Sequence, residues 1–212
     1  ANPPFNVDEV DADKVKNDPR LPFGLPGVNK NKKVSNGNYL WISYFYSYLN
    51  KTGKAGFVMS SQASSSGRDE AKVRQKLIET GHVDVMIAIR PNFFYTRSVP
   101  CELWFFDKNK PPRPQGEGRG EGGVFNNQDK VLMIDARNVY RKVTRKIFDF
   151  SPEQLKNITS IVWLYRGQKE RFLKLLEEHL ETAVSEAGRA TGPLNIFIST
   201  LTSLVEKAMP FL

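Results

Sequence analysis

Residues 68–90, RDEAKVRQKLIETGHVDVMIAIR, determine the fold class of this chain. Their first part predicts a helix over 68–80 that Gly81 ends, with an apolar side made by Val73, Leu77 and Ile78. Their second part, 83–89, is β-branched and nearly all apolar, which is typical of a strand buried on both faces. A helix followed at once by a buried strand indicates an α/β fold.

Similar elements lie on both sides of this stretch. After Asn38, aromatic residues at helical spacing predict an amphipathic helix whose apolar face packs on a flat surface: Trp41, Tyr44, Phe45, Tyr48 and Leu49. Residues 54–60 then predict a strand, and 61–67 a polar loop. Residues 99–106 predict a strand in a hairpin with 83–89, and 130–135 an edge strand. Chemistry is expected at the strand ends of such a sheet.

The two ends of the chain differ in character. Residues 1–34 are rich in Pro, Gly and Asn and predict a long irregular loop, and 111–123 a flexible one. From Ser151-Pro152-Glu153, which marks a helix start, the tail is predicted to be helical, with one face made by Ile158, Ile161, Val162 and Tyr165. Two further helices, 168–187 and 194–209, are expected on either side of a break at Gly188 and Gly192-Pro193. We therefore divide the chain into an α/β domain, 1–150, and a helical tail, 151–212.

The excess positive charge lies in the first of these parts. Residues 1–150 hold 24 Lys+Arg and 16 Asp+Glu, whereas residues 151–212 hold 7 of each. A basic region of this size is compatible with contacts to a phosphate backbone. It is equally compatible with a solvated basic surface, so charge alone does not identify the partner.

Composition excludes several other classes. A hydrophobic content of 40% predicts a packed core, and no apolar run approaches the roughly 20 residues that span a bilayer. Without a signal-peptide pattern in the first residues, we expect a soluble cytoplasmic protein with no membrane contact. Cys101 has no second cysteine to pair with, and two histidines beside it make no zinc-ligand set, so we expect no metal.

Asn2-Pro3-Pro4-Phe5 is the stretch that is most informative about chemistry. Two prolines fix the backbone, so the Asn carbonyl and the following backbone carbonyl can be aimed rigidly. An exocyclic amine that donates to both carbonyls becomes more nucleophilic, and the aromatic ring can stack on the base that carries it. The same four residues can also form a simple turn.

Residues 91–100, PNFFYTRSVP, offer a second aromatic group between two predicted strands. An exposed aromatic there can clamp a flipped base from its other face, since a reacting atom inside a duplex is otherwise out of reach. Alternatively, Phe93 and Phe94 plug the end of the sheet. The two motifs together are more specific than either alone.

Five motifs occur in an order that resembles the modification subunit of type I restriction-modification systems: NPPF at 2–5, GKAGFV at 53–58, RQKLIE at 74–79, NFFY at 92–95 and VPC at 99–101. The resemblance covers roughly residues 1–165. It implies the C-terminal part of a Rossmann-like sheet and a site-specific N6-adenine DNA methyltransferase that uses S-adenosylmethionine. It also implies DNA, a specificity subunit and a restriction subunit as partners, with the helical tail engaging the complex.

The resemblance further implies roles for individual residues. Asn2 and Pro3 accept hydrogen bonds from the adenine N6 amine, Pro4 fixes their geometry and Phe5 stacks on the flipped adenine. Asn2 is also the one residue of this chain implied to contact the cofactor. The second stacking aromatic is Phe94, with Phe93 and Tyr95 as weaker candidates, and the cation that follows in this DNA-binding loop is Arg97.

The chain departs from the family in one respect. A Gly-rich loop and an acidic residue that hold the cofactor normally precede Asn-Pro-Pro-Phe, which here begins at residue 2. The glycines at 116–123 follow no suitable strand, so they do not replace that loop. We therefore expect the C-terminal part of a subunit, with an unpaired strand edge near Phe57, that alone binds the cofactor weakly and does not turn over.

Two other functions remain open at this point. In the first, the chain is a non-catalytic module whose basic part grips DNA and whose tail docks on a specificity subunit. In the second, it is an RNA or protein N-methyltransferase, because an Asn-Pro-Pro-aromatic motif also serves amines outside DNA.

Overall fold

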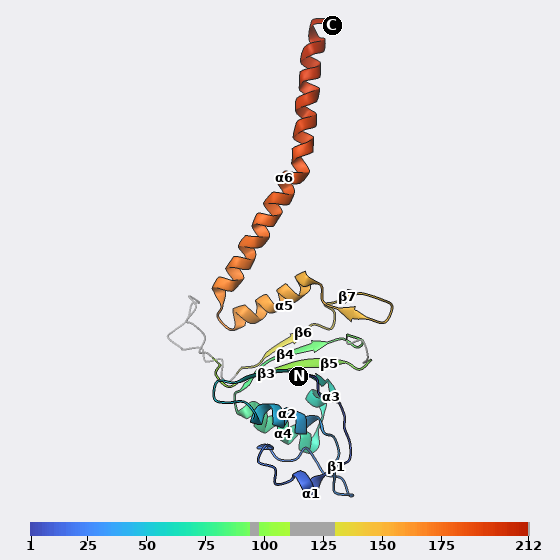
Figure 1. Ribbon diagram of the computed structural model, residues 1–212, viewed down its shortest axis with the longest axis vertical. Helices are drawn as coiled ribbons and strands as arrows, with labels where there is room; N and C mark the ends of the chain where they lie inside the picture. The colour runs from blue at the N-terminus through green and yellow to red at the C-terminus, as the bar shows by residue number, and fades with distance from the viewer. Residues whose placement is uncertain (94–97, 111–129, 212) are drawn as a thin grey trace. The chain divides into compact units, whose positions relative to one another are not determined.

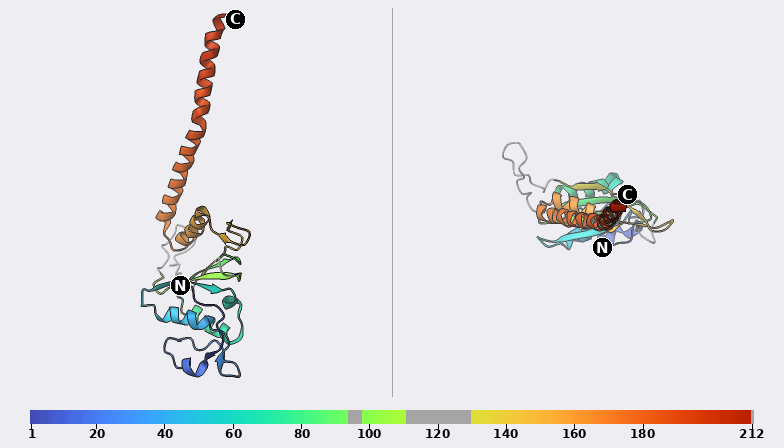
Figure 2. Two further views of the ribbon diagram at one scale, coloured as in Figure 1. Left: turned by 45° about the vertical axis from the view of Figure 1, so that its right-hand side comes forward. Right: turned by 90° about the horizontal axis from the view of Figure 1, so that it is seen from above.

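The computed structural model describes residues 1–93, 98–110 and 130–211. The chain forms two compact units, residues 1–167 and 168–212. Figures 1 and 2 show the elements, which are, in order, β1 (Val10–Asp11), α1 (Ala12–Val15), β2 (Lys33–Val34), α2 (Asn38–Ser47), β3 (Lys54–Ser60), α3 (Gln62–Ser65), α4 (Arg68–Glu79), β4 (Val83–Ile89), β5 (Cys101–Asp107), β6 (Leu132–Asp135), β7 (Arg141–Lys142), β8 (Phe148–Asp149), α5 (Pro152–Tyr165), α6 (Lys169–Ala208) and the short 3-10 helix η2 (Met209–Phe211).

The first unit is built on a four-stranded mixed sheet with the order β3-β5-β4-β6. Strand β5 pairs antiparallel with both β3 and β4, and β6 pairs parallel with β4. The predicted hairpin and the predicted edge strand are therefore both confirmed. The α/β fold class with a helical tail is confirmed as well.

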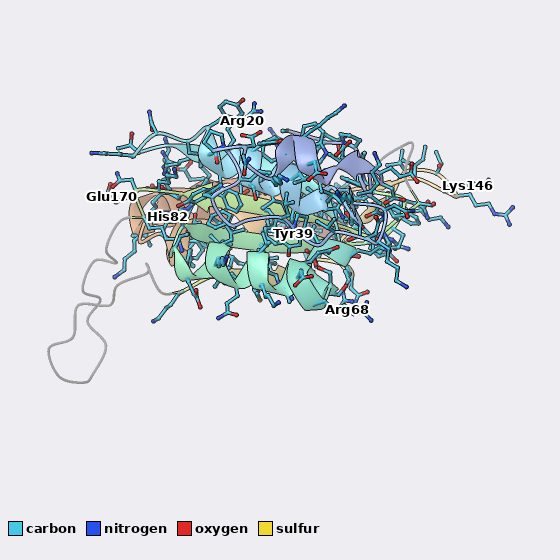
Figure 3. The ribbon with its side chains drawn as sticks, turned by 90° about the horizontal axis from the view of Figure 1, so that it is seen from below. Arg20, Tyr39, Arg68, His82, Lys146 and Glu170 are labelled. Carbon is cyan, nitrogen blue, oxygen red and sulfur yellow. The ribbon has the colours of Figure 1, made fainter. Side chains whose placement is uncertain are left out.

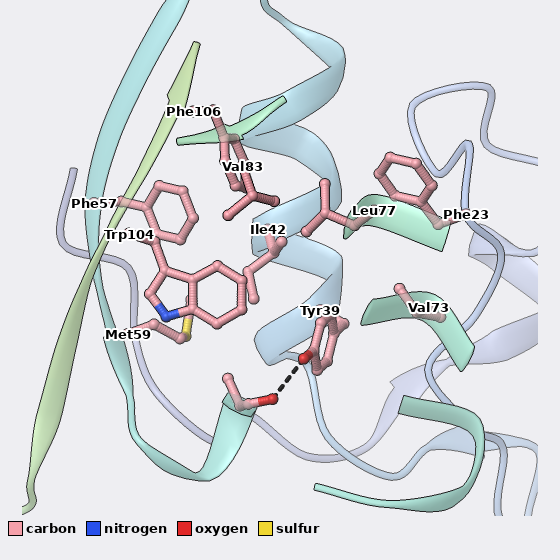
Figure 4. Close-up of a cluster of buried hydrophobic side chains, with 11 residues drawn as sticks. Phe23, Tyr39, Ile42, Phe57, Met59, Val73, Leu77, Val83, Trp104 and Phe106 are labelled. Atoms are coloured by element: carbon pink, nitrogen blue, oxygen red, sulfur yellow. Dashed lines mark hydrogen bonds between the residues drawn. The ribbon is translucent and has the colours of Figure 1, made fainter. Parts of the chain in front are cut away.

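Helices cover both faces of this sheet (Figure 1). On one face α2 and α4 pack against it, and the buried side chains between them form a cluster (Figure 4) that contains Phe23, Tyr39, Ile42, Phe57, Met59, Ala63, Val73, Leu77, Val83, Trp104 and Phe106. On the other face Ile158 of α5 packs with Val85, Ile87 and Ile89 of β4. Residues of β4 thus enter both clusters, which explains why the strand is apolar at every position except Asp84.

The helices bury slightly different faces from those predicted. In α2 the most buried apolar side chains are Tyr39 and Ile42, while Tyr48, just after the helix, is exposed. Ile78 and Ile161, which were predicted on the apolar sides of their helices, are also exposed, at 43% and 46%. Each of these residues lies at the margin of an apolar stripe, where one step of about 100° moves a side chain from the sheet to solvent.

Helix α5 belongs to the first compact unit and is fixed at both ends. At its start the Ser151 Oγ accepts from the Gln154 amide and the Gln154 side chain accepts from the Ser151 amide, which is a complete capping box. At its end the Arg166 guanidinium donates to the buried Asp84 carboxylate of β4, at 2.5 and 3.0 Å.

The second unit consists of α6 and η2, and here a prediction was wrong. Gly188 and Gly192-Pro193 do not separate two helices, because α6 runs unbroken from Lys169 to Ala208 with Pro193 inside it. An interior proline costs about 3 kcal/mol of helix stability, and 195–200 (NIFIST) after it are not strong helix formers, so the helix accommodates the proline by bending rather than by ending. Figure 1 shows that α6 changes direction part-way along its length.

Several short elements were not predicted. Residues 1–34 are mostly irregular, as expected, yet they include β1, α1 and β2 around a small buried cluster of Ala12, Leu21, Val34 and Leu40. The polar loop at 61–67 contains the single-turn helix α3, and 141–149 form the β7–β8 hairpin. Among the described residues, no helix combines the length and apolar character needed to cross a membrane.

Candidate functional site

Three segments leave the sheet at the same end. Ser60 at the end of β3 lies opposite Cys101 of β5, which lies opposite Ile89 at the end of β4. Ala88 of β4 in turn lies beside Asp135, the last residue of β6. The carboxyl ends of β3, β4 and β6 therefore share one end of the sheet, which is where ligand sites of α/β sheets occur.

The Asn2-Pro3-Pro4-Phe5 segment runs toward that end. The Ala1 amino group donates to the Gly56 carbonyl at 2.7 Å, and the Val58 amide donates to the Ala1 carbonyl at 3.0 Å, which is the pattern of neighbouring parallel strands. The edge of β3 predicted to be unpaired is thus met at one point by Ala1. Continuing parallel to β3, the chain carries Asn2 toward the strand's carboxyl end.

The four residues of the motif differ in exposure. Asn2 and Pro4 are exposed, Pro3 is buried and Phe5 is half-buried. Phe5 packs against both hydrophobic clusters, so it lies at the edge of the sheet between the two helical layers. An exposed amide beside a buried proline suits a rigid acceptor that faces a ligand, and the half-buried ring retains accessible surface.

Three asparagines outside the sequence motifs, Asn6, Asn36 and Asn38, hold this segment in place. The Asn6 amide donates to Asn38 Oδ1, and Asn38 Nδ2 donates back to Asn6 Oδ1, both at 2.8 Å. Asn36 Nδ2 also donates to Asn6 Oδ1, at 3.2 Å. Asn6 has a φ of 53°, in the left-handed region that asparagine tolerates well. The pairing joins residues about 30 positions apart, so local sequence gave no signal for it.

Gly37 completes this attachment, because its amide donates to the Val7 carbonyl at 2.8 Å. A Cβ at Gly37 would lie 3.0 Å from that carbonyl oxygen, a tight contact that favours glycine at this position. The loop that follows Phe5 is therefore fastened to the amino end of α2.

Replacing Asn38 by alanine should loosen the motif. The variant leaves the Asn6 amide without its acceptor, which should lower the free energy of unfolding by about 1–3 kcal/mol. Hydrogen exchange should accelerate at the Asn6 and Gly37 amides, measured by mass spectrometry of peptides covering 2–10 and 34–40. Asn31→Ala, at an exposed asparagine, is the matched control. Unchanged exchange at Asn6 would show that this pairing does not hold the loop.

The turn after β4 carries the second predicted aromatic group. Asn92 has a φ of 61°, and the half-buried Phe93 lies against Phe150 with ring centroids 4.4 Å apart. Phe93 therefore packs on the same cluster as Phe5. Phe94, Tyr95 and Arg97 lie outside the described residues, so the second stacking aromatic stays a prediction.

The β7–β8 hairpin is attached to this turn. The Phe148 amide donates to the Asn92 carbonyl at 3.2 Å. The Arg90 guanidinium lies over the rings of Tyr140 and Phe148, 4.0 and 3.7 Å from their centroids, and its buried Nε has no hydrogen-bond partner among the described residues. The aromatic contacts hold this cation by cation–π attraction.

Two ion pairs lie at the base of the hairpin. Arg137 binds Asp135, and Arg141 binds Asp149, each with a shortest distance of 2.7 Å. Hydrogen bonds from Arg137 lower the pKa of Asp135 to about 2, and hydrogen bonds from Arg141 lower the pKa of Asp149. Both carboxylates are therefore charged at neutral pH and neutralise these two arginines.

The described residues do not make a site for an adenosyl cofactor. Gly37 and Gly67 precede α2 and α4 singly rather than in a Gly-rich turn that follows a strand. A cavity of about 230 Å³ between the sheet and α5 is lined mainly by apolar side chains, including Ile87, Phe105 and Ile158. Such a lining suits neither a charged amino acid group nor a ribose. No group of three potential metal ligands occurs in the described part of the chain.

Comparison with known proteins identifies the family. The model of the N-6 DNA methylase family matches residues 1–181. The chain belongs to the N-6 DNA methylase family. Within it, the chain is similar over 164 residues, at 39% identity, to the type I restriction enzyme MjaIX methylase subunit of Methanocaldococcus jannaschii, with 74% of this chain and 26% of that protein covered.

A second relative is similar in sequence, and one solved structure is similar in fold. The type I restriction enzyme HindI methylase subunit of Haemophilus influenzae is 27% identical over 159 residues, covering 74% of this chain and 31% of that protein. The fold resembles the type I restriction-modification methyltransferase subunit of Streptococcus thermophilus, with a TM-score of 0.61 and 21% identity over 76% of this chain and 30% of that one. This N-6 DNA methylase chain thus spans about a quarter to a third of the proteins it matches.

Proposed function

We propose that this chain is part of a type I methylation subunit that methylates N6 of adenine at specific DNA sites, with S-adenosylmethionine as the methyl donor. The observation that carries the proposal is the position of Asn2-Pro3-Pro4-Phe5: it leads to the carboxyl end of the sheet, with an exposed asparagine beside a buried proline. Because its substrate is chromosomal DNA, we place the protein in the cytoplasm.

The chemistry follows from the groups in that segment. The Asn2 side-chain carbonyl and the Pro3 backbone carbonyl accept one hydrogen bond each from the adenine amine, and Pro4 limits the motion of both. The nitrogen then rehybridises and its lone pair becomes available. When it takes the methyl group, the bond between that carbon and the donor's sulfur would break, and the nitrogen would lose one of its two protons to solvent. Phe5 stacks on the base, which must leave the duplex to reach the site.

In this proposal the chain supplies the residues that bind adenine, the base that receives the methyl group. A bound S-adenosylmethionine supplies the methyl group, and the elements that hold its methionine and ribose are not among the described residues. We therefore propose that a further part of the subunit completes the cofactor site, consistent with the share of the relatives that this chain spans.

The test is product analysis with the complete methylation subunit assembled with its partners. Duplex DNA incubated with tritiated S-adenosylmethionine should yield labelled N6-methyladenine after nuclease digestion. Label in RNA, or on a glutamine side chain, in preference to duplex DNA would overturn the proposal. DNA binding with no label at all would favour the non-catalytic module.

We also propose that α6 is the element that joins the subunit to its specificity subunit. Its apolar residues follow a heptad pattern through the whole helix, which is typical of a coiled-coil seam: Leu173, Leu176, Leu180, Ala183, Ala187, Ala190, Leu194, Phe197, Leu201, Leu204 and Ala208. The leucines and Phe197 of this seam are exposed. Within the second unit no other long helix covers them.

Replacing Leu201 and Leu204 by glutamate should prevent assembly. Burying a leucine contributes about 1.5–3 kcal/mol, so losing two should weaken association at least about 100-fold. Size-exclusion chromatography with light scattering should show the free subunit instead of the complex. The matched control is Ser199→Glu with Ser203→Glu, on the opposite side of the helix. A complex of unchanged mass with the leucine variant would exclude α6 as the docking element.

A further inference from the structure

We propose that the β7–β8 hairpin is a phosphate clamp that grips the backbone of duplex DNA beside the adenine site. That DNA lies beside the hairpin rests on the proposed function. That the hairpin binds phosphate rests on the charge and geometry of its own residues. Three side chains carry it: Lys142, Arg145 and Lys146, all exposed.

Charge pairing singles out these three residues. From Arg137 to Lys146 the chain holds five cations and no acidic residue. The flanking carboxylates Asp135 and Asp149 neutralise Arg137 and Arg141 at the base of the hairpin. Within the described residues no ion pair involves Lys142, Arg145 or Lys146. The tip of the hairpin, residues 142–147, thus presents a net charge of +3.

The hairpin is held firmly enough to present that charge in one place. Its turn is closed by the Val143 and Thr144 amides, which both donate to the Ile147 carbonyl. Its base is fixed by Arg90 against the rings of Tyr140 and Phe148, and Gln154 Nε2 donates to the Tyr140 carbonyl at 3.0 Å. Figure 3 shows Lys146 extending away from the rest of the molecule. Arg90 is thus a positioning residue for the tip.

The position relative to Asn2 suits a duplex. The hairpin follows β6, whose carboxyl end lies at the same end of the sheet as the segment carrying Asn2. From the Ala1–Asn2 segment beside β3 to β6 there are four interstrand spacings, which amount to about 19 Å. DNA carries one negative charge about every 1.7 Å of its axis, so a duplex that places a base at Asn2 has phosphates within this span. Phosphodiester oxygens are acceptors for both lysine and arginine.

The test compares two variants of the complete subunit that lose the same charge. The first carries Lys142→Gln, Arg145→Gln and Lys146→Gln. The second carries Lys14→Gln, Lys30→Gln and Lys51→Gln, at exposed lysines of which Lys51 precedes β3 at the opposite end of the sheet. Affinity for a fluorescein-labelled duplex is measured by anisotropy between about 50 and 200 mM salt.

Each phosphate contact contributes about 0.9 to the slope of log affinity against log salt, so the hairpin variant should lose about 2–3 from the slope. Its affinity should fall at least tenfold more than that of the control. Equal slopes for the two variants would overturn the proposal. So would a hairpin variant that binds duplex normally but fails to assemble with the other subunits, because the tip would then contact protein.

A second measurement needs no variant. Saturating duplex should protect Lys142 and Lys146 of the wild-type subunit from acetylation, as read by mass spectrometry, and leave Lys30 reactive. Equal reactivity with and without DNA would contradict the clamp. Detection of N6-methyladenine by the same wild-type protein reports on the proposed function separately, so failure of one is distinguishable from failure of the other.

Discussion

Replacing Asn2 by alanine should lower the rate of adenine methylation by the assembled subunit about 100- to 1,000-fold, the range found when one polar group that stabilises transition-state charge is removed. The amine nitrogen gains positive charge as it attacks the methyl group, and its N–H groups become stronger donors. The Asn2 carbonyl therefore contributes more in the transition state than in the ground state. The loss should appear in kcat rather than in the KM for DNA.

Single-turnover methylation with tritiated S-adenosylmethionine is the measurement. Because Asn2 is exposed, the variant should melt at the wild-type temperature, which separates lost chemistry from lost folding. Asn31→Ala, at another exposed asparagine, should methylate at the wild-type rate. If the Asn2 variant retains full activity, the catalytic role is wrong and the non-catalytic DNA-binding module becomes the better interpretation.

Replacing Arg166 by methionine should have the largest effect on stability. Asp84 is buried, and the change leaves its carboxylate without the guanidinium that donates two hydrogen bonds to it. Breaking one side of a buried pair costs about 3–5 kcal/mol. For a unit of this size the melting temperature should then fall by about 6–20 °C.

The melting temperature can be measured by calorimetry or circular dichroism, and two further variants serve as comparisons. Arg137→Met removes a similar two-bond pair with Asp135, but both of those side chains are exposed, so little change is expected. The double variant Asp84→Leu with Arg166→Met should recover most of the loss, since no unpaired charge remains. If Arg166→Met alone melts like the wild type, the pair does not fasten α5 to the sheet.

The sheet and its covering helices could be predicted because their signals are local. Apolar periodicity along 68–80 and 83–89 is sufficient to identify α4 and β4, and Gly81 marks the turn between them. The same logic was wrong for α6. Gly188 and Pro193 are local breaking signals, but a helix can bend at such residues instead of ending, and the local sequence does not distinguish the two outcomes.

The surroundings of the candidate site were harder to predict because they depend on distant contacts. The motif at residues 2–5 could be found by its residue types alone, whereas the Asn6–Asn38 pairing exists only after α2 has docked. Strands β7 and β8 have two residues each, too few for an alternating pattern. Their place is set by the contacts of Arg90 with Tyr140 and Phe148.

Strand β3 lies at the edge of the sheet, and in the described residues its outer backbone is met by Ala1 at Gly56 and Val58. An open strand edge is a template on which a second chain can add. The isolated chain should therefore aggregate increasingly as its concentration is raised. The exposed Lys54 is the one charged residue of β3 that opposes such pairing. Co-expression with a polypeptide that pairs with this edge should raise the yield of soluble protein.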